Sequence, residues 1–236
     1  RVFFVAVVGS NLDEFFMKRI GGLKQQVGAG VKKLTVDGML PQEQIDACYK
    51  VAQEILEEQR LIANHLRELL EKEEICFRSY AQLNATQKKQ MDQYFKREIY
   101  PLLTPQGIDP AHPFPFISNL SLNFLVQVRF PNEPDRTSLA RIKVPIGDNL
   151  PRFIQLPDRN HFVPLEEVLR NNLDMLLPEM DLVSEHMFRV TRNSNTERNE
   201  DHADDLLSMR LGMRHRWQTK RGMPGRQRII DWVTLD

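Results

Sequence analysis

The amino-acid sequence predicts an α+β protein in which an N-terminal antiparallel helical bundle precedes a mostly antiparallel sheet with helices. Apolar residues recur at helical spacing up to about residue 103, and beyond residue 115 they alternate with polar residues as in half-buried strands. Between these patterns, five prolines from Pro101 to Pro115 cannot continue a helix and favour an extended connection. We therefore predict a helical N-terminal domain at residues 1–103 whose first part is missing, an incomplete α+β domain at 104–211, and a divergent basic tail at 212–236.

The first helix is predicted from a polar stretch that follows the apolar run at residues 2–8. Ser10 can cap a helix through its hydroxyl, and Asp13 and Glu14 would then lie near the positive end of the helix dipole. Asn11 would sit at the start of this helix, where its amide can donate to and accept from a ligand; alternatively, Asn11 is only part of the cap. One buried stripe is expected at Leu12, Phe16, Ile20, Leu23 and Val27.

Two further helices complete the predicted bundle. Asp37 and Gly38 indicate a turn, and Pro41 opens a long charged helix, which is either a solvated amphipathic helix or an interaction surface. A third helix begins after Asn84, an N-cap with Gln87 in the capping-box position. The apolar stripe of the long helix is expected at Ile45, Tyr49, Ala52, Ile55, Leu56, Ile62, Leu66, Leu69 and Leu70, and that of the third helix at Met91, Phe95 and Ile99.

Strand signals dominate the second half of the sequence. Residues 120–128 alternate as in a half-buried strand, and residues 139–144 form the return strand after a turn at 130–135. Two short apolar runs on either side of residues 157–160 form a second hairpin, and another strand covers residues 187–191. Helices are expected at residues 165–177 and 199–209.

Composition narrows the class of protein. The 236 residues include 32 Lys or Arg and 32 Asp or Glu, so the charge of the whole chain favours neither nucleic acid nor an acidic membrane surface. Cys48 and Cys76 lack metal-ligand spacing, which favours a reduced, cytoplasmic protein, with peripheral association with a membrane left open. No apolar run approaches ~18 residues, so no membrane-spanning helix is expected. The sequence lacks an initiating Met and its first motif follows at once, so we expect the chain to start inside its gene product.

Several groups of residues resemble binding sites but have a structural explanation. Four clustered glycines do not fit the phosphate-loop pattern and are better explained by helix packing or helix ends: Gly21, Gly22, Gly28 and Gly30. His112 is a candidate nucleophile, but it has no adjacent acid or Lys, which favours packing or hydrogen bonding. No metal site is predicted, because the clustered ligand types crowd the first turns of a helix, where acids are favoured anyway: Glu200, Asp201, His202, Asp204 and Asp205.

Two arginines and the basic tail are candidate anion contacts. Arg189 and Arg192 would point to opposite faces of one strand, so that one of them lines a polyanion path or both form ion pairs between domains or subunits. Residues 206–230 contain no acid and include Trp217, a composition that suits RNA or another polyanion. The basic residues of this tail are Arg210, Arg214, Arg216, Lys220, Arg221, Arg226 and Arg228.

Longer motifs carry a family resemblance. The first is Ser10-Asn11-Leu12-Asp13-Glu14-Phe15-Phe16, followed by Gly22-Leu23-Lys24. Others lie at residues 101–105, 108–110, 112–123, 143–145, 150–153 and 188–193; the longest reads His-Pro-Phe-Pro-Phe-Ile-Ser-Asn-Leu-Ser-Leu-Asn. In this order, and over roughly residues 1–211, the sequence resembles the polyphosphate kinase family, ATP-dependent enzymes that make inorganic polyphosphate.

The resemblance implies an enzyme that reversibly transfers the γ-phosphoryl group of ATP to polyphosphate through a phosphohistidine. It also implies a head domain used in dimer contacts and two C-terminal domains that carry the catalytic histidines and the Mg²⁺ ligands. Asn11 matches the family's ATP-contacting asparagine and is the one functional residue carried over, although Gly9 stands where Ser is common. No catalytic residue is assigned here, because Lys does not follow two positions after any of His65, His112, His161, His186, His202 and His215.

Three hypotheses follow. The preferred one is a polyphosphate kinase fragment that contributes to ATP binding and dimerisation, lacks the catalytic domains and is inactive alone. Its expected partners are ATP, polyphosphate and a second copy of the chain, but not nucleic acid. The alternatives are a non-catalytic helical interaction module that binds a protein partner or RNA, and an ATP sensor without catalysis.

Overall fold

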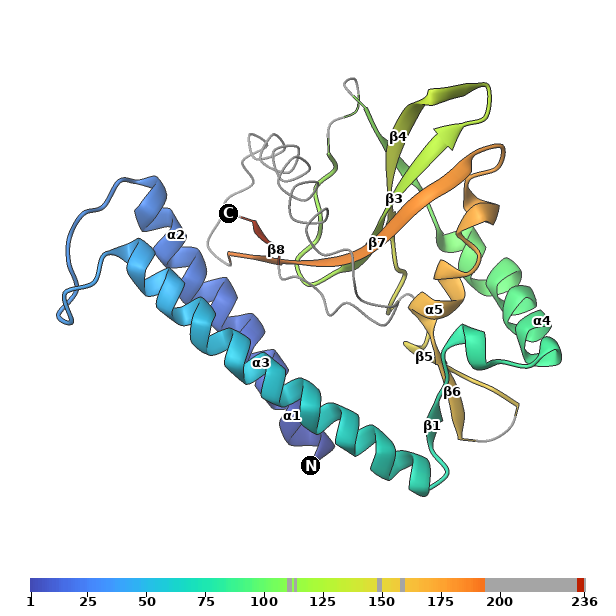
Figure 1. Ribbon diagram of the computed structural model, residues 1–236, viewed down its shortest axis with the longest axis horizontal. Helices are drawn as coiled ribbons and strands as arrows, with labels where there is room; N and C mark the ends of the chain where they lie inside the picture. Colours follow the sequence, from blue (N-terminus) through green and yellow to red (C-terminus); the bar gives the residue numbers. More distant parts are fainter. Residues whose placement is uncertain (110–111, 113, 148–149, 158–159, 194–232, 236) are drawn as a thin grey trace. The chain divides into compact units, whose positions relative to one another are not determined.

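The computed structural model describes residues 1–109, 112, 114–147, 150–157, 160–193 and 233–235 (Figure 1). Contacts within the chain define two compact units. The first contains Arg1–Cys76 together with residues that follow position 190, and the second contains Phe77–Val190. A helical region followed by antiparallel sheets with helices confirms the predicted fold class. The domain ranges 1–103, 104–211 and 212–236 stay a prediction, and most of the tail lies outside the described residues.

The first unit begins with one continuous helix instead of a helix capped at Ser10. The prediction of a cap at Ser10 is wrong, because the apolar residues before it are themselves helical and already supply the preceding turns. A π-helical turn follows, and its i to i−5 bonding includes the Gly21 N–H donating to the Phe16 carbonyl. The continuous helix consists of α1 (Val2–Phe15), the π-turn η1 (Phe16–Ile20) and α2 (Gly21–Gly28).

α3 (Pro41–Lys72) packs antiparallel against this helix. Gln59 donates to the Val5 carbonyl at 2.8 Å, and Arg19 donates to Gln44 at 3.0 Å, so the partner numbers run in opposite directions. The predicted stripe of the first helix is confirmed except at Val27, which is exposed. The buried residues between the helices are Leu12, Phe16, Ile20, Leu23, Ile45 and Ala52.

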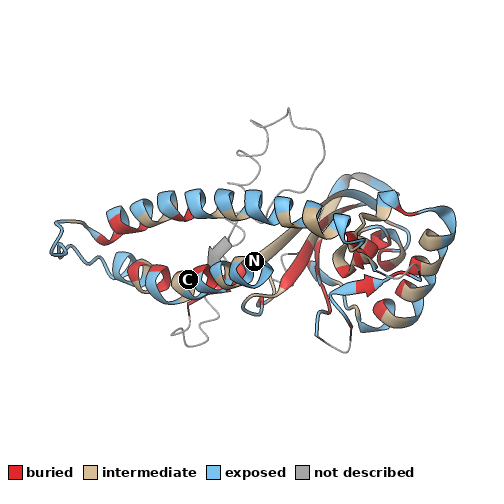
Figure 2. Ribbon diagram, turned by 90° about the horizontal axis from the view of Figure 1, so that it is seen from below, coloured by how far each residue is buried: buried red, intermediate tan, exposed pale blue. Residues whose placement is uncertain are grey.

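The apolar stripe of α3 is only partly covered. Ile45 and Ala52 are buried, but Ile55 and Ile62 are exposed to 37% and 50%. Figure 2 shows the exposed outer face along the length of this helix. At its start, Leu40 has no side-chain acceptor, and the Glu43 carboxylate instead accepts the Leu40 N–H at 2.7 Å. The prediction of a long amphipathic helix is thus confirmed, while the periodicity overstated how much of it is buried.

Two of the clustered glycines have the local roles predicted for them. Gly30 has φ +66° and ends α2, with its N–H donating to the Val27 carbonyl at 3.0 Å. At Gly21, a Cβ atom would lie 2.8 Å from Cγ of Asn193, so only glycine permits this approach. At Gly22, by contrast, a Cβ atom would meet nothing within 4 Å.

A five-stranded sheet with the order β2-β4-β3-β7-β8 contains the long strands of the second unit. The pairs β2–β4, β4–β3 and β3–β7 are antiparallel. The alternation predicted for residues 120–128 is confirmed by the burial of Leu122, Phe124, Val126 and Val128. The strands are β2 (Gln106–Ile108), β3 (Leu122–Phe130), β4 (Glu133–Lys143), β7 (Asp181–Arg192) and β8 (Val233–Leu235).

A smaller sheet with the order β1-β6-β5 contains the predicted second hairpin. Its strands are β1 (Cys76–Phe77), β5 (Phe153–Gln155) and β6 (His161–Pro164). The helix predicted at residues 165–177 stops early, as α5 (Leu165–Arg170) and a 3₁₀ turn, η5 (Leu173–Leu176). Asn171 and Asn172 interrupt it, because their side chains donate to the carbonyls of Glu167 and Val168 at 2.8 and 2.9 Å.

The third predicted helix packs on the sheet. α4 (Ala85–Tyr94) begins with the predicted capping box, in which Asn84 Oδ1 accepts from the Gln87 N–H at 2.9 Å. Its inner face is buried as predicted, but together with sheet and α5 residues, so its assignment to the helical bundle was wrong. Helical periodicity identifies which face is buried but not what covers it. This core includes Met91, Phe95, Ile99, Phe124, Val126, Ile142, Val168 and Leu169.

The connections add short elements that the sequence did not predict. These are the 3₁₀ turns η2 (Tyr80–Gln82) and η4 (Tyr100–Leu102). The predicted third helix continues past α4 to Ile99, but as the π-turn η3 (Phe95–Ile99). The proline-rich connection therefore starts with a 3₁₀ turn and contains the edge strand β2 instead of being extended throughout. The helix predicted at residues 199–209 lies outside the described residues.

The two neighbouring glycines of α2 give a matched test of the packing. Gly21→Ala should lower the free energy of unfolding by about 1–3 kcal/mol, because the new Cβ atom would overlap Asn193. Gly22→Ala should raise it by about 0.5–1 kcal/mol, because alanine favours helix and meets nothing there. Urea denaturation measures both. Equal effects of the two substitutions would contradict the close contact at Gly21.

Candidate functional site

Asn11 lies within α1 and faces solvent. It is exposed, whereas the next two residues, Leu12 and Asp13, are buried. Its predicted position at the mouth of a helix is wrong, so the free N–H groups of a helix start are not available beside it. Its side chain makes no hydrogen bond within the described ranges, which leaves the amide open to a ligand. The assignment of Asn11 to ATP stays a prediction.

Side chains one helical turn from Asn11 extend this exposed strip of α1. Val8 precedes it by three residues and Glu14 follows it by three, and Phe4, a further turn back, is 70% exposed. Glu14 pairs with Lys18, whose hydrogen bond and charge hold the pKa of the Glu14 carboxyl below its usual value. The strip is thus apolar at one end, carries an amide in its middle and ends in a neutralised ion pair. Such a surface suits the base and ribose of a nucleotide better than its phosphates.

In the second unit, a hydrogen-bonded turn at residues 118–121 leads into β3. Leu120 has φ +60°, which is uncommon for a residue with a side chain. The Leu120 N–H donates to the Val190 carbonyl at 2.7 Å, and the Leu120 carbonyl accepts from Arg189 Nε at 3.3 Å. The Ser121 hydroxyl donates to the Ser118 carbonyl at 2.7 Å. These bonds fix the backbone where β3 begins.

Asn123 connects this turn to a buried arginine on β4. Its Nδ2 donates to the carbonyl and hydroxyl oxygens of Ser121 at 2.9 and 3.0 Å, and its Oδ1 accepts from Arg141 Nε at 2.8 Å. Arg141 Nη1 donates to Gln106 Oε1 at 2.7 Å. Asn123 is 0% exposed and Arg141 only 7%. Burial lowers the pKa of the Arg141 guanidinium, although an arginine still remains charged.

Arg141 is a residue of this site that was not predicted from the sequence. Its alternation with Ala140 and Ile142 places it on the polar face of β4, where a charged residue is expected to be solvated. The one available signal was the position of Arg141 in the sequence. It lies two residues before the segment at 143–145, which carries part of the family resemblance. That segment lies opposite another such segment, the one at 112–123. Neither segment indicates that the side chain would be buried.

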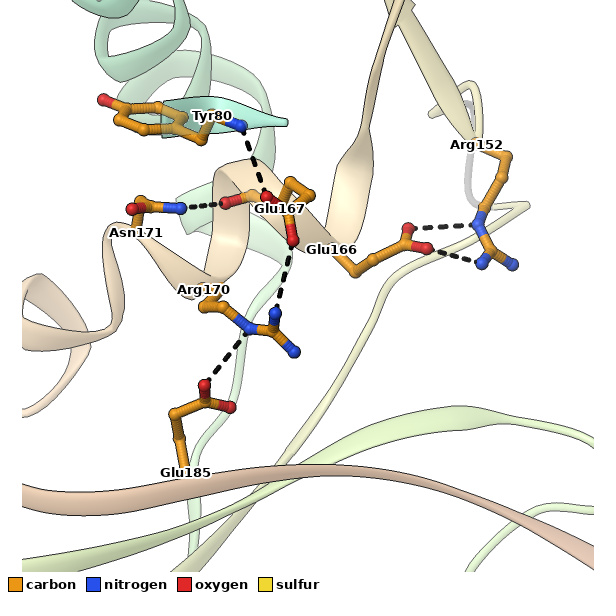
Figure 3. A network of polar contacts seen from close by, with 7 residues as sticks. All are labelled: Tyr80, Arg152, Glu166, Glu167, Arg170, Asn171 and Glu185. Carbon is orange, nitrogen blue, oxygen red and sulfur yellow. Dashed lines mark hydrogen bonds and ion pairs between the residues drawn. The ribbon is translucent and has the colours of Figure 1, made fainter. Parts of the chain in front are cut away.

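Arg170 contrasts with Arg141 in having two acidic partners. Its Nη1 lies 3.2 Å from Glu167 Oε1, and its Nε lies 3.2 Å from Glu185 Oε1 (Figure 3). The same Glu167 carboxylate accepts from the Tyr80 N–H at 3.2 Å. This network joins α5, η2 and β7, and the two carboxylates compensate the charge of Arg170, so the network has a structural explanation.

Tyr80 is the titratable group most shifted in this network. Burial is the main cause that raises the pKa of its hydroxyl, and the hydrogen bond to Asp92 adds to the effect. A hydroxyl that donates to a carboxylate resists ionisation, because losing its proton would place two negative charges together.

His112 has an acidic partner, contrary to the sequence analysis. Its Nδ1 lies 3.1 Å from Asp109 Oδ1, and its backbone N–H donates to the same oxygen at 2.8 Å. Of the two roles favoured for His112, packing or hydrogen bonding, the structure shows hydrogen bonding. Asp109 precedes His112 by three residues within a turn. This spacing was the available signal, and it is missed when only directly adjacent residues are considered.

The remaining candidates are only partly described. Arg189 and Arg192 both lie on β7, on opposite faces by their spacing, and burial lowers the pKa of Arg192. Within the described ranges, no three His, Cys, Asp or Glu side chains gather as they would around a metal ion. No helix in the described part of the chain is long and apolar enough to cross a membrane. The acids at residues 200–205 and the basic tail lie outside the described residues.

An open pocket of about 400 Å³ lies in the second unit between α4 and β5. Gln90, Gln93 and Tyr94 supply polar groups to it, and Pro157 also lines it. Burial raises the pKa of Tyr94. Arg97 also lines the pocket but pairs with Glu98 at 2.7 Å. The pocket therefore offers no uncompensated charge.

Comparison with protein families matches almost the whole chain. The polyphosphate kinase N-terminal domain matches residues 1–78, and the polyphosphate kinase middle domain matches residues 86–221. The two matches meet close to the division between the compact units.

Individual relatives give the same result. The chain is 41% identical over 255 residues to a polyphosphate kinase of Thermosynechococcus vestitus, a match that covers 100% of this chain and 34% of the relative. It is 44% identical to a polyphosphate kinase of Synechocystis sp., over 88% of this chain and 30% of the relative. The crystal structure of polyphosphate kinase from Porphyromonas gingivalis shares the fold, with a TM-score of 0.67 at 23% identity over 83% of this chain and 29% of that one. The chain spans about a third of the length of these curated relatives.

Tyr80 gives a prediction about alkaline pH. Its pKa is raised in the folded state above the value of 10.0 for a free tyrosine, so its contribution to stability is present below about pH 10 and is lost at higher pH. Tyr80→Phe should therefore make the free energy of unfolding less pH-dependent between about pH 9 and pH 11. Denaturation at a series of pH values tests this. Tyr100→Phe, at an exposed position, is the control; equal pH profiles for the two variants would exclude the role of Tyr80.

Proposed function

The chain belongs to the polyphosphate kinase family, and from that premise we propose that it is part of an enzyme that reversibly transfers the γ-phosphoryl group of ATP to polyphosphate. The proposal includes a phosphohistidine intermediate whose histidine lies outside this chain. Two observations support that division: the relatives are about three times as long, and no histidine here has the expected Lys two positions on. The chain alone should therefore not make polyphosphate.

The proposed reaction is a pair of displacements at phosphorus. An imidazole nitrogen attacks the γ-phosphorus of ATP, the bond to the β–γ bridging oxygen breaks, and ADP leaves with that electron pair. A terminal oxygen of polyphosphate then attacks the same phosphorus and releases the imidazole. Such transfers depend on positioning and charge neutralisation, so a domain that only orients the nucleotide contributes to the rate.

We propose that this chain orients ATP through Asn11. The exposed strip of α1 supports the assignment, because the Asn11 amide is open to a ligand and apolar side chains flank it on one side. The strip carries no unpaired cation at Asn11, since Lys18 is engaged with Glu14. The phosphates of ATP would then be held by the remaining part of the protein.

Mg²⁺ belongs to the proposed activity but is not assigned to residues here. In enzymes that transfer phosphoryl groups, this ion is usually held by one or two carboxylates, by water molecules and by the phosphates of the substrate.

A dimer is proposed as the working form, with contacts through the second unit. Exposed apolar side chains of that unit support the proposal: Phe116, Phe153, Leu182 and Val183. Light scattering of the purified chain should give twice the monomer mass, and Leu182→Glu should shift it toward the monomer. A concentrated sample of the unaltered chain that remains monomeric would exclude this part of the proposal.

The central test replaces the matching third of the Thermosynechococcus vestitus relative with this chain. The chimera should synthesise polyphosphate from ATP, whereas the chain alone should not. Asn11→Ala should raise the KM for ATP by up to about 10-fold, the value of one hydrogen bond between uncharged groups. Steady-state kinetics at varied ATP concentration measure the change.

Gln26→Ala is the matched control, because it removes another exposed carboxamide of the same continuous helix. Neither substitution should lower stability, since alanine favours helix. Equal KM values for the Asn11 and Gln26 variants would refute the assignment of Asn11. A folded but inactive chimera would refute the proposed function.

A further inference from the structure

The five-stranded sheet has a second face that the apolar core does not use. Phe124, Val126 and Ile142 point into the core with α4 and α5. By the two-residue period of a strand, Asn123 and Arg141 point to the opposite face. Lys143 lies directly opposite Asn123 in the β3–β4 register and is exposed on that same face. Two cations and the amides of Asn123 and Gln106 therefore lie on that face.

The charge of Arg141 has no acidic partner within the described residues. Its Nε and Nη1 atoms donate to uncharged amides, and its Nη2 atom makes no hydrogen bond to the described part of the chain. A buried ion without a counter-ion is costly, because desolvation is not repaid by attraction. Arg170 shows the usual solution in this same unit, with two carboxylates within 3.2 Å.

The surrounding bonds hold the guanidinium in place. Asn123 fixes Nε and is itself held by Ser121, while Gln106 on the edge strand β2 fixes Nη1. The neighbouring paired positions on this face carry no acid, as β3 contributes Leu125 and β7 contributes His186. The first acid on the face is Asp181, at the far end opposite Arg129.

We propose that Arg141 and Lys143 form a binding subsite for a phosphate oxyanion on this face of the sheet. A guanidinium whose Nη2 group is free presents the donor geometry that phosphate oxygens accept, and a nearby lysine adds a mobile positive charge. The bound oxyanion would supply the missing counter-charge for Arg141.

Polyphosphate is the occupant that fits best, and this choice rests on the proposed function. Polyphosphate presents closely spaced oxyanions along an unbranched chain. The guanidinium of Arg141 and the ammonium group of Lys143 can therefore bind neighbouring phosphates. Inorganic phosphate shares the same chemistry and is the second ligand to be tested. A carboxylate from the rest of the protein is the competing explanation, and it predicts no preference for phosphate.

The test titrates the purified chain with short-chain polyphosphate, with inorganic phosphate and with acetate at matched ionic strength. Isothermal titration calorimetry measures binding, and circular dichroism checks folding. Polyphosphate should bind saturably and more tightly than phosphate, with acetate much weaker. Arg141→Lys should weaken polyphosphate binding by about 10- to 100-fold, because it removes the paired N–H donors of the guanidinium and keeps the positive charge.

Lys143→Gln and Lys89→Gln are a matched pair of substitutions at exposed positions. Unlike Arg141→Lys, they do not change a buried side chain. Both lysines are exposed, but Lys89 lies on α4. Lys143→Gln should weaken binding by about 2- to 5-fold, and Lys89→Gln should not change it. Equal effects of the two substitutions, equal binding of acetate, or no binding of polyphosphate would each overturn the subsite.

These results are independent of the test of the proposed function. An active chimera whose KM for ATP responds to Asn11→Ala, combined with no polyphosphate binding here, would overturn the subsite alone. Specific polyphosphate binding by this chain with a folded but inactive chimera would overturn the proposed function and leave the subsite standing.

Discussion

The two-residue period of β3 is the constraint on which the second unit depends. This strand pairs with β4 on one side and β7 on the other, so its side chains have only two directions available. Phe124 and Val126 fill the core, which forces Asn123 to the opposite face, where it is fully buried. A buried amide must be hydrogen-bonded, and Ser121 and Arg141 provide the partners. The polar site is thus a direct consequence of how the core is filled.

The sequence predicted periodic features well because they depend on neighbouring residues. The alternation of β3, the capping box at Asn84 and the apolar stripe of the first helix all follow from spacing along the chain. Ser10 shows the limit of such local signals. A capping residue ends a helix only where the preceding residues leave it, and here the apolar run before Ser10 continues the helix.

Features that depend on partners distant in sequence could not be predicted. The inner face of α4 was identified, but its burial with the sheet was not, because amphipathicity does not name the partner. The exposed position of Asn11 and the burial of Arg141 also result from tertiary packing. Of the candidate site, the sequence therefore supplied the identity of Asn11 through the family resemblance, but neither its surroundings nor the network around Arg141.

The approach of Asn193 to Gly21 has a consequence for how the protein forms during synthesis. The contact belongs to the first unit, although 171 intervening residues separate its two members, and most of them build the second unit. The helical pair leaves the ribosome first but cannot close this contact until the chain beyond β7 has emerged. Closing so long a loop is entropically cheaper once the intervening segment is already compact. The order of translation thus favours a nested assembly, in which the inserted sheet unit folds before the helices that begin the chain are completed.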